Sequence, residues 1–322
     1  MRRLLSSVVL IGVCATSVRA QTPTGSEGSL FLLLPTGAQA VGMGQAMVAA
    51  KPGSEGIWWN PASIGDQSQK ELAIHHSKTI AGIGDALSFV LPIHGLGTTA
   101  YSINILNIGD QQVTDDFGNV VGVILPRDVV FAGTYALSLG KRLTAGATYK
   151  LIQLRVDCSG QCASVGPEVE SSRAVDLGAQ YETEVGAPLT LGIAVRNLGG
   201  RLNSRETNQR DPLPTQVEAG LMYRLKFIDH YVKDTELRTA ASYINSRAFG
   251  GKSIRLGTDV MYQGKVHLRA GYVGHDRRGD ASASLGFGLQ SGSFVFDIAR
   301  TFGGLPADNG QTPVYVSLRY LF

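Results

Sequence analysis

The sequence predicts an all-β protein, a transmembrane antiparallel outer-membrane β-barrel of about 14 strands. The first observation is an alternation of apolar and polar side chains, with a period of two residues, along almost the whole chain after residue 70. The second is a set of connections that are mostly tight and long in turn. The third is that no later stretch holds the roughly 18 apolar residues that a membrane-spanning helix needs.

Residues 1–20 have the pattern of a secretory signal peptide that is removed. Arg2 and Arg3 form a charged start, an apolar run follows over 4–13, and residues 18–20 loosely resemble a cleavage site. A membrane anchor is disfavoured because the run is too short to span a bilayer. A lipoprotein signal at Cys14 is disfavoured because Val13 stands where such signals carry a small residue.

The composition excludes one class of partner. Charged residues make up 17% of the chain, against about 25% in soluble domains. The sequence has 29 basic and 26 acidic residues, and residues 1–20 hold three of the arginines and no acid, so the remaining chain is neutral. We expect no nucleic-acid partner, since such binding depends on a basic surface.

The predicted strands are alternating segments of about 10 residues, which is the length of a tilted transmembrane strand. Near the C-terminus, for example, Val316, Leu318 and Tyr320 share one face of the strand, and Ser317 and Arg319 share the other. Such alternation gives one apolar and one polar face. An even number of strands is typical of bacterial outer-membrane barrels. The predicted strands cover 70–77, 84–93, 97–107, 128–139, 143–154, 173–183, 188–198, 214–225, 236–245, 253–262, 265–274, 280–290, 293–301 and 313–322.

The connections support a barrel independently of the strand pattern. Transmembrane barrels have short periplasmic turns and longer outer loops, whereas a soluble β-sandwich gives no reason for that alternation. The tight set covers 94–96, 140–142, 184–187, 263–264 and 291–292, with a long exception at 226–235. The long set covers 108–127, 155–172, 199–213, 246–252, 275–279 and 302–312. The terminal Phe322 resembles the insertion signal of outer-membrane barrels.

Charged residues on the polar faces of the predicted strands should point into the lumen. Either they form a solvated or salt-bridged interior that holds the shape of the barrel, or they line a path for a ligand or an ion. Their mixed signs argue against a strongly ion-selective pore. They are Lys150, Asp176, Glu218, Arg224, Arg255, Asp259, Arg269, Asp297 and Arg319.

The segment 21–69 precedes the strands and has a different character. Gly42 and Gly44 permit backbone geometry or close approach that other residues forbid. Pro61 keeps Asn60 out of the helical region, and this pair favours a turn. The adjacent side chains of Trp58 and Trp59 need a place to pack, and a barrel interior is a good candidate.

This segment resembles the PorV/PorQ family of outer-membrane proteins, within the FadL-like superfamily. The family has a Gly-Ala-x-Ala-x-Gly-x-Gly stretch followed by Tyr-Trp-Asn-Pro-Ala-Gly. Here Trp58 replaces the usual Tyr and Ser63 replaces the usual Gly. The runs 195–199 and 211–214 also resemble the family, so the similarity covers nearly the whole chain after residue 20. The matching residues are Gly37, Ala38, Ala40, Gly42, Gly44, Trp59, Asn60, Pro61 and Ala62.

The resemblance implies a barrel over 70–322, an N-terminal plug over 21–69 inside its lumen, outer-membrane lipid around it, and neither catalysis nor a cofactor. It also implies two roles. The main one is a type IX secretion-associated component that binds secreted proteins or secretion-system subunits. The alternative is a FadL-like transporter of hydrophobic small molecules such as fatty acids. A structural barrel with no cargo is a third reading.

Each role makes a prediction about the barrel. The chain is shorter than the secretion-shuttle members of the family, which places it nearer to the PorQ-like or generic members. Protein binding would use the long outer loops. Transport would use an apolar pocket near Ile57, Trp58 and Trp59, with a lateral opening at a kink in a glycine-rich strand such as 284–288.

The remaining sites are few. Cys158 and Cys162 lie four positions apart in a predicted outer loop, where an oxidising location favours a local disulfide. A zinc site would need two more ligands at suitable spacing, and the polar run 109–119 does not fit a twelve-residue calcium loop. Neither a Gly-x-Ser-x-Gly elbow nor a His-Glu-x-x-His motif is present, so we expect no enzyme and no metal site.

Overall fold

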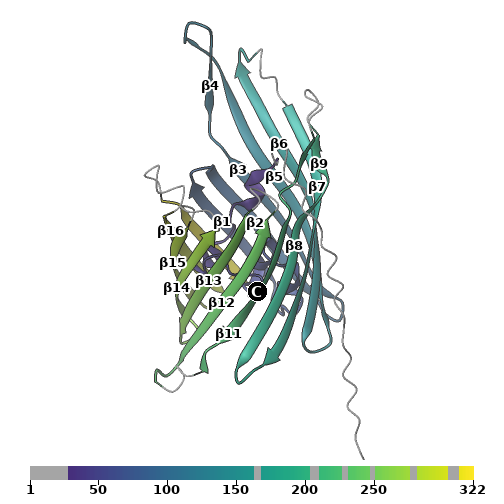
Figure 1. The fold of residues 1–322 in the computed structure, drawn as a ribbon, viewed down its shortest axis with the longest axis vertical. Coiled ribbons are helices and arrows are strands. Elements are labelled where there is room, and N and C mark those ends of the chain that lie inside the picture. Colours follow the sequence, from purple (N-terminus) through teal and green to yellow (C-terminus); the bar gives the residue numbers. More distant parts are fainter. Residues whose placement is uncertain are drawn as a thin grey trace, which may run out of the picture.

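The computed structural model describes residues 28–162, 168–203, 210–226, 231–246, 251–275, 281–303 and 312–322. The predicted signal peptide and the first residues of the predicted N-terminal segment, 21–27, lie outside the described residues. The described chain begins with short helices and continues with strands (Figure 1). No helix among the described residues is long and apolar enough to cross a membrane. The helices are η1 Leu30–Leu33, α1 Ala38–Gly42, η2 Gly53–Trp58 and η3 Pro61–Ile64.

In the part of the chain that the structure describes, fourteen strands close into one antiparallel barrel (Figure 1). They are β1 Glu71–Thr79, β2 Gly82–Ile93, β3 Gly97–Asn107, β5 Val120–Leu139, β6 Leu143–Gly160, β7 Glu168–Glu184, β8 Pro188–Gly199, β11 Gln216–Arg224, β12 Thr235–Ser246, β13 Lys252–Tyr262, β14 Val266–His275, β15 Ser282–Ser291, β16 Phe294–Gly303 and β17 Val314–Leu321. Each strand pairs with the next barrel strand, and the circle closes where β1 pairs with β17. The predicted fold class is therefore confirmed.

The alternation of side chains runs as the sequence predicts. Large apolar residues such as Tyr101, Leu268 and Leu285 are about 60% exposed on the outer face, where a bilayer would cover them. The inner face carries small, polar and charged side chains, most of them buried. Aromatic rings gather near the tight-turn end, where Phe322 stacks on Phe89 and Tyr320, as at the interfacial girdle of an outer-membrane barrel.

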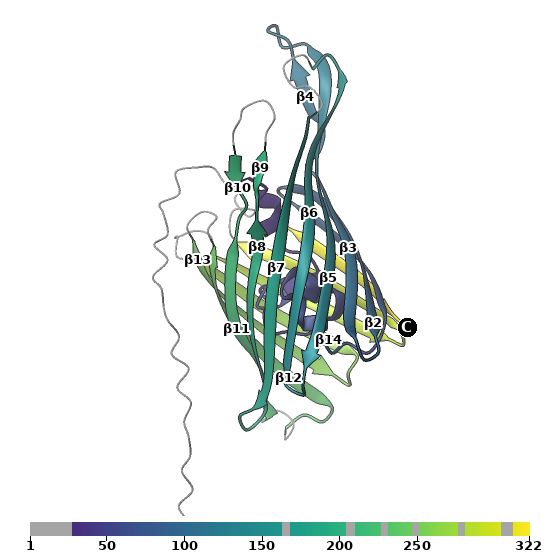
Figure 2. The ribbon, with the colours of Figure 1, turned by 90° about the vertical axis from the view of Figure 1, so that its right-hand side faces the viewer.

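The predicted outer loops differ most from the structure. β5, β6 and β7 run well past the predicted ends, through much of the regions 108–127 and 155–172 (Figure 2). A further strand, β4 Gln111–Thr114, pairs with the extended part of β5. We call β4 with residues 120–126, 155–160 and 168–172 the projecting sheet. The sequence misses it because residues 120–126 are apolar at successive positions and so lack the alternation that marks a half-buried strand.

Two smaller features occupy other predicted loops. β9 Arg201–Asn203 and β10 Arg210–Pro212 pair with each other within the predicted loop 199–213. Cys158, at the end of β6, forms a disulfide with Cys162. β15 pairs without any shift of register on either side, so no bulge interrupts the glycine-rich run 284–288.

Candidate functional site

Residues 29–69, the N-terminal segment, lie inside the barrel (Figure 2). Met43, Met47, Ile57, Trp59 and Ile64 are buried there and form the hydrophobic core together with inward side chains of the wall. The helix α1 packs against β14 to β17, and η3 packs against β5 to β7. The segment therefore contacts the inner face of the wall on opposite sides of the barrel.

Glycines on the inner face of the wall make room for this segment. A Cβ on Gly257 would lie 2.3 Å from the carbonyl oxygen of Met43, and one on Gly271 would lie 1.9 Å from the amide nitrogen of Gly44. Gly286, which lies in the glycine-rich run 284–288, likewise packs against Gly42. Close packing against the segment explains why a glycine stands at this position. The inner glycines that contact the segment are Gly146, Gly178, Gly192, Gly220, Gly257, Gly271 and Gly286.

Asn60 fastens the Trp-Asn-Pro-Ala motif to the wall. Its side-chain oxygen accepts a hydrogen bond from the amide of Ala62 and caps η3, whose first residue is Pro61. Its side-chain nitrogen donates to the carbonyl oxygens of Val48 at 2.6 Å and of Ala179, in β7, at 3.3 Å. A single amide thus joins two parts of the segment and the wall, which explains an Asn at this position.

The two tryptophans stand side by side in the sequence but have different partners. Trp59 donates its indole N–H to the carbonyl oxygen of Thr36, and the guanidinium groups of Arg196 and Arg255 lie 5.1 and 5.5 Å from its ring. Trp58 is buried, and its indole nitrogen has no hydrogen-bond partner among the described residues. Trp58 therefore presents a free donor inside the barrel.

Eight of the nine predicted lumen charges form two buried networks rather than a solvated path. In the first, Asp297 accepts hydrogen bonds from Arg269 at 2.6 Å and from Arg319 at 3.0 Å. Arg269 also lies 3.3 Å from Asp259. Arg319 donates to the carbonyl oxygen of Pro52 at 2.7 Å, so this network holds the N-terminal segment.

The second network lies on the other side of the lumen. Lys150 pairs with Asp176 at 2.6 Å, beside a shift of register between β7 and β8. Glu218 lies 3.5 Å from Arg196 and 3.9 Å from Arg255. The contacts of Arg196 and Arg255 with Trp59 join this network to the N-terminal segment as well. The salt-bridged reading of the lumen fits these distances, and no open ion path is needed to explain the charges.

Sequence reasoning missed three charged members of this interior. Arg196 stands in a run that we used only for the family resemblance, although it faces inward and donates to the carbonyl oxygen of Trp58 at 3.0 Å. Glu55 is fully buried and accepts from the amide of Ala40 at 3.0 Å. Glu71 accepts from the amide of Ser54 at 3.1 Å. The sequence could have indicated Glu55, because it is a lone acid among small and apolar residues.

The arrangement around His75 is not that of a hydrolase. The same ring nitrogen, Nδ1, lies 2.8 Å from the hydroxyl of Ser317 and 3.7 Å from Glu55. A catalytic triad needs the nucleophile and the orienting acid on different ring nitrogens. All three groups are also buried. Within the described ranges, no cluster of three or more His, Cys, Asp or Glu side chains is placed to hold a metal ion.

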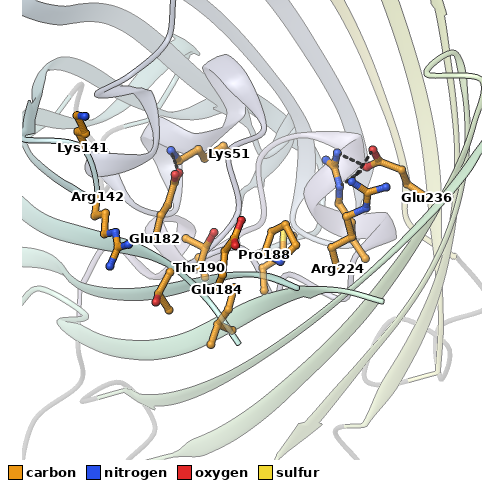
Figure 3. A pocket seen from close by; sticks show the side chains of 14 residues that line it. Lys51, Lys141, Arg142, Glu182, Glu184, Pro188, Thr190, Arg224 and Glu236 are labelled. Atoms are coloured by element: carbon orange, nitrogen blue, oxygen red, sulfur yellow. Dashed lines mark hydrogen bonds and ion pairs between the residues drawn. The ribbon is translucent and has the colours of Figure 1, made fainter. Parts of the chain in front are cut away.

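A polar cavity of about 610 Å³ opens at the tight-turn end of the barrel (Figure 3). Lys51, from the N-terminal segment, pairs there with Asp66 and with Glu182 of β7. Partial burial acts against the charge, but these hydrogen bonds raise the pKa of Lys51 above its usual value. Arg224 also lines this mouth and lies 3.5 Å from Glu236, so it belongs to neither buried network described above.

The opposite end of the segment borders two small cavities of about 30 and 20 Å³. Both are lined by Phe31, Leu34, Thr36 and Asn104. The first also reaches Pro35, His75, His76, Ser77, Ala86 and Leu106, and the second reaches Leu32, Trp58, Trp59, Val130, Lys150 and Arg196. These linings mix apolar and aromatic side chains with polar and charged groups.

The fold is similar to solved outer-membrane channels. The Pseudomonas putida toluene transporter TodX has a TM-score of 0.61 at 12% identity, with 88% of this chain and 97% of that chain covered. The Ralstonia pickettii toluene transporter TbuX gives 0.54 at 12% identity, with 88% and 97% covered. A Pseudomonas aeruginosa FadL homologue gives 0.54 at 13% identity, with 90% and 98% covered.

Comparison of sequences adds no closer relationship. No protein-family model matches this sequence, and no curated protein matches it. At identities of 12–13% the solved structures establish the fold alone. That fold is the closed antiparallel β-barrel of these channels, and it places the chain in the outer membrane of a Gram-negative bacterium, as the sequence predicts.

Proposed function

We propose that this protein is a non-enzymatic channel that carries hydrophobic small molecules across the outer membrane. The observation that carries the proposal is the pair of small cavities between the outer end of the N-terminal segment and the wall, which share Phe31 and Leu34 as apolar lining. Two barrels of similar fold are toluene transporters. Of the two roles that the family resemblance implies, this is the alternative reading, and the comparisons support it better than the main one.

A solute would enter at the cavities and leave through the polar mouth. Cavities of about 30 and 20 Å³ are too small for a hydrocarbon, because pockets that hold small molecules measure about 300–1,000 Å³. Entry therefore requires η1 to move. Phe31 and Leu32 of η1 are only partly buried and pack on the edge of the core, so this helix is the part of the segment that moves at least cost. The segment would serve as the plug.

Filling the cavity tests the proposal. Ala86 is buried and lines the larger cavity, whereas Ala147 is exposed on the outer face of β6. We expect Ala86→Phe to reduce uptake of a labelled long-chain fatty acid or of toluene by cells at least about tenfold, since it removes the binding space. Ala147→Phe, the matched control, should leave uptake unchanged. Equal uptake by both variants, with equal amounts of folded barrel, would contradict transport through this cavity.

A second variant tests the same cavity in the opposite direction. Phe31→Ala removes the ring that both cavities share, and we expect it to enlarge the site and raise the rate of uptake. A fall in uptake to the level of cells without the protein would show that the ring is needed for entry rather than limiting it.

Secretion is the second candidate function. The resemblance of the N-terminal motif supports it, and the projecting sheet offers a protein-sized surface outside the barrel. Native protein purified in mild detergent separates the two functions by mass spectrometry of what accompanies it. Secreted proteins that share a C-terminal domain would favour secretion. An apolar molecule at about one per barrel, without a protein partner, would favour transport.

A further inference from the structure

Arginines gather on the outer face of β5 to β7 where these strands leave the barrel. The pairing of β3 with β5 ends at Arg127, and the pairing of β8 with β7 ends at Ala174, next to Arg173. Arg155 of β6 lies directly opposite Arg127. Arg201 of β9 follows the end of β8. We call Arg127, Arg155, Arg173 and Arg201 the arginine patch.

The patch interrupts the apolar outward face of β5 and β6. On β5 the outward series runs from Phe131 through Val129 to Arg127, and on β6 it runs from Leu151 through Gln153 to Arg155. Because short turns of such barrels face the periplasm, the projecting sheet lies outside the cell. The arginines therefore stand at the level of the outer-leaflet head groups.

These cations have few counter-charges. Among the described residues, Arg155 pairs with Asp157 at 2.8 Å, and no carboxylate lies within 4 Å of Arg127, Arg173 or Arg201. Like charges directly opposite each other on paired strands are destabilising. An anion bound between Arg127 and Arg155 would relieve that repulsion.

A hollow of about 600 Å³ lies beside the patch. Arg173 and Arg201 line it together with Gln153 and Ser171, which add an amide and a hydroxyl, and Leu151 provides an apolar wall. Guanidinium groups bind phosphate through paired hydrogen bonds. The hollow thus combines phosphate-binding groups with a surface that suits an acyl chain.

We propose that the arginine patch binds the phosphorylated head group of a glycolipid in the outer leaflet, with Leu151 against its acyl part. The occupant is a lipid rather than a soluble anion because the arginines face outward, directly above the lipid-facing belt. This site lies on the outer wall and does not depend on transport through the lumen.

The test uses the full chain, folded in detergent and titrated with diphosphorylated lipid A while bound lipid is counted by native mass spectrometry. We expect Arg127→Gln/Arg173→Gln/Arg201→Gln to lower the affinity about 100-fold, because each basic residue near an anionic lipid surface contributes to binding. The matched control is Lys70→Gln/Lys233→Gln/Lys265→Gln, which removes the same charge at the tight-turn end and should bind lipid A as the native chain does.

Two further measurements decide the chemistry. Lipid A without phosphates should bind native protein as weakly as diphosphorylated lipid A binds the arginine variant. Inorganic phosphate at matched concentration should not displace the lipid. Equal affinity of the arginine variant and the native chain, equal binding of dephosphorylated lipid, or displacement by inorganic phosphate would each overturn the proposal. Resistance of the folded variants to unfolding in sodium dodecyl sulfate at room temperature verifies that each barrel has formed.

Discussion

Glu55 is a buried acid of the N-terminal segment that contacts both the helix α1 and the barrel wall. Its carboxylate accepts from the amides of Gln39 and Ala40 and lies 3.7 Å from His75 of β1. Burial raises the pKa of Glu55 to about 7, although the nearby charge of Arg319 acts in the opposite direction. Asp297 also raises this pKa, and Arg269 lowers it.

This pKa predicts how stability depends on pH. The pKa is raised from 4.5, so the folded protein holds a proton that the unfolded chain releases. The contribution of Glu55 is then complete below about pH 4.5 and declines as the pH rises through about 7. The thermal unfolding midpoint of the native protein should fall as the pH rises from about 4.5 to about 7. We expect this fall to be smaller in Glu55→Gln, because the glutamine stays neutral. Glu184→Gln, at an exposed acid, is the control, and an unchanged slope in Glu55→Gln would contradict the assignment.

Lys51 is the second residue whose charge joins the segment to the wall, and it lies at the opposite end from the two small cavities. Its partners are Asp66, within the segment, and Glu182 on β7. All three side chains are partly exposed, so we expect Lys51→Met to lower the free energy of unfolding by about 1 kcal/mol or less. Faster proteolysis near residue 66 in the folded barrel should accompany this small loss. Cleavage at the native rate would show that the ion pairs do not hold the segment.

At the scale of the element, the inner glycines decide whether the segment fits. Gly271 leaves no room for a Cβ, which would lie 1.9 Å from the amide nitrogen of Gly44. Gly271→Ala should cost about 1–3 kcal/mol of unfolding free energy, as overpacking does. Gly133→Ala is the matched control, since no atom lies within 4 Å of its Cβ position. Chemical denaturation of the two folded variants measures the difference, and equal midpoints would show that the segment adjusts at no cost.

The projecting sheet is an element whose disulfide should matter only locally. The Cys158–Cys162 bond spans a separation of four residues, and so short a ring restricts little of the unfolded chain. We expect Cys158→Ser/Cys162→Ser to leave the unfolding midpoint of the barrel unchanged. Proteolysis within 155–160 should become faster. A fall in the barrel midpoint would mean that the projecting sheet and the barrel unfold together.

At the scale of the whole molecule, the sequence predicts the strands whose apolar and polar residues alternate. The predicted strand 253–262 is within one residue of β13, because Ile254, Leu256 and Val260 alternate with Arg255 and Asp259. The projecting sheet was missed because residues 120–126 are apolar at successive positions, so no alternation marks a strand there. The buried networks were predicted only as inward charges, since pairs such as Pro52 with Arg319 join positions far apart in the chain.

Ion conductance through the whole barrel tests whether the N-terminal segment closes the lumen. The segment fills the interior between the two networks, and a barrel of this size without it would enclose water. Removing residues 28–69 should therefore convert a protein with little ion conductance in planar bilayers into an open channel. The conductance should show weak ion selectivity, because the exposed charges have both signs. Equal conductance of both proteins, with the shortened chain shown to be folded, would mean that the segment packs inside the barrel without closing it.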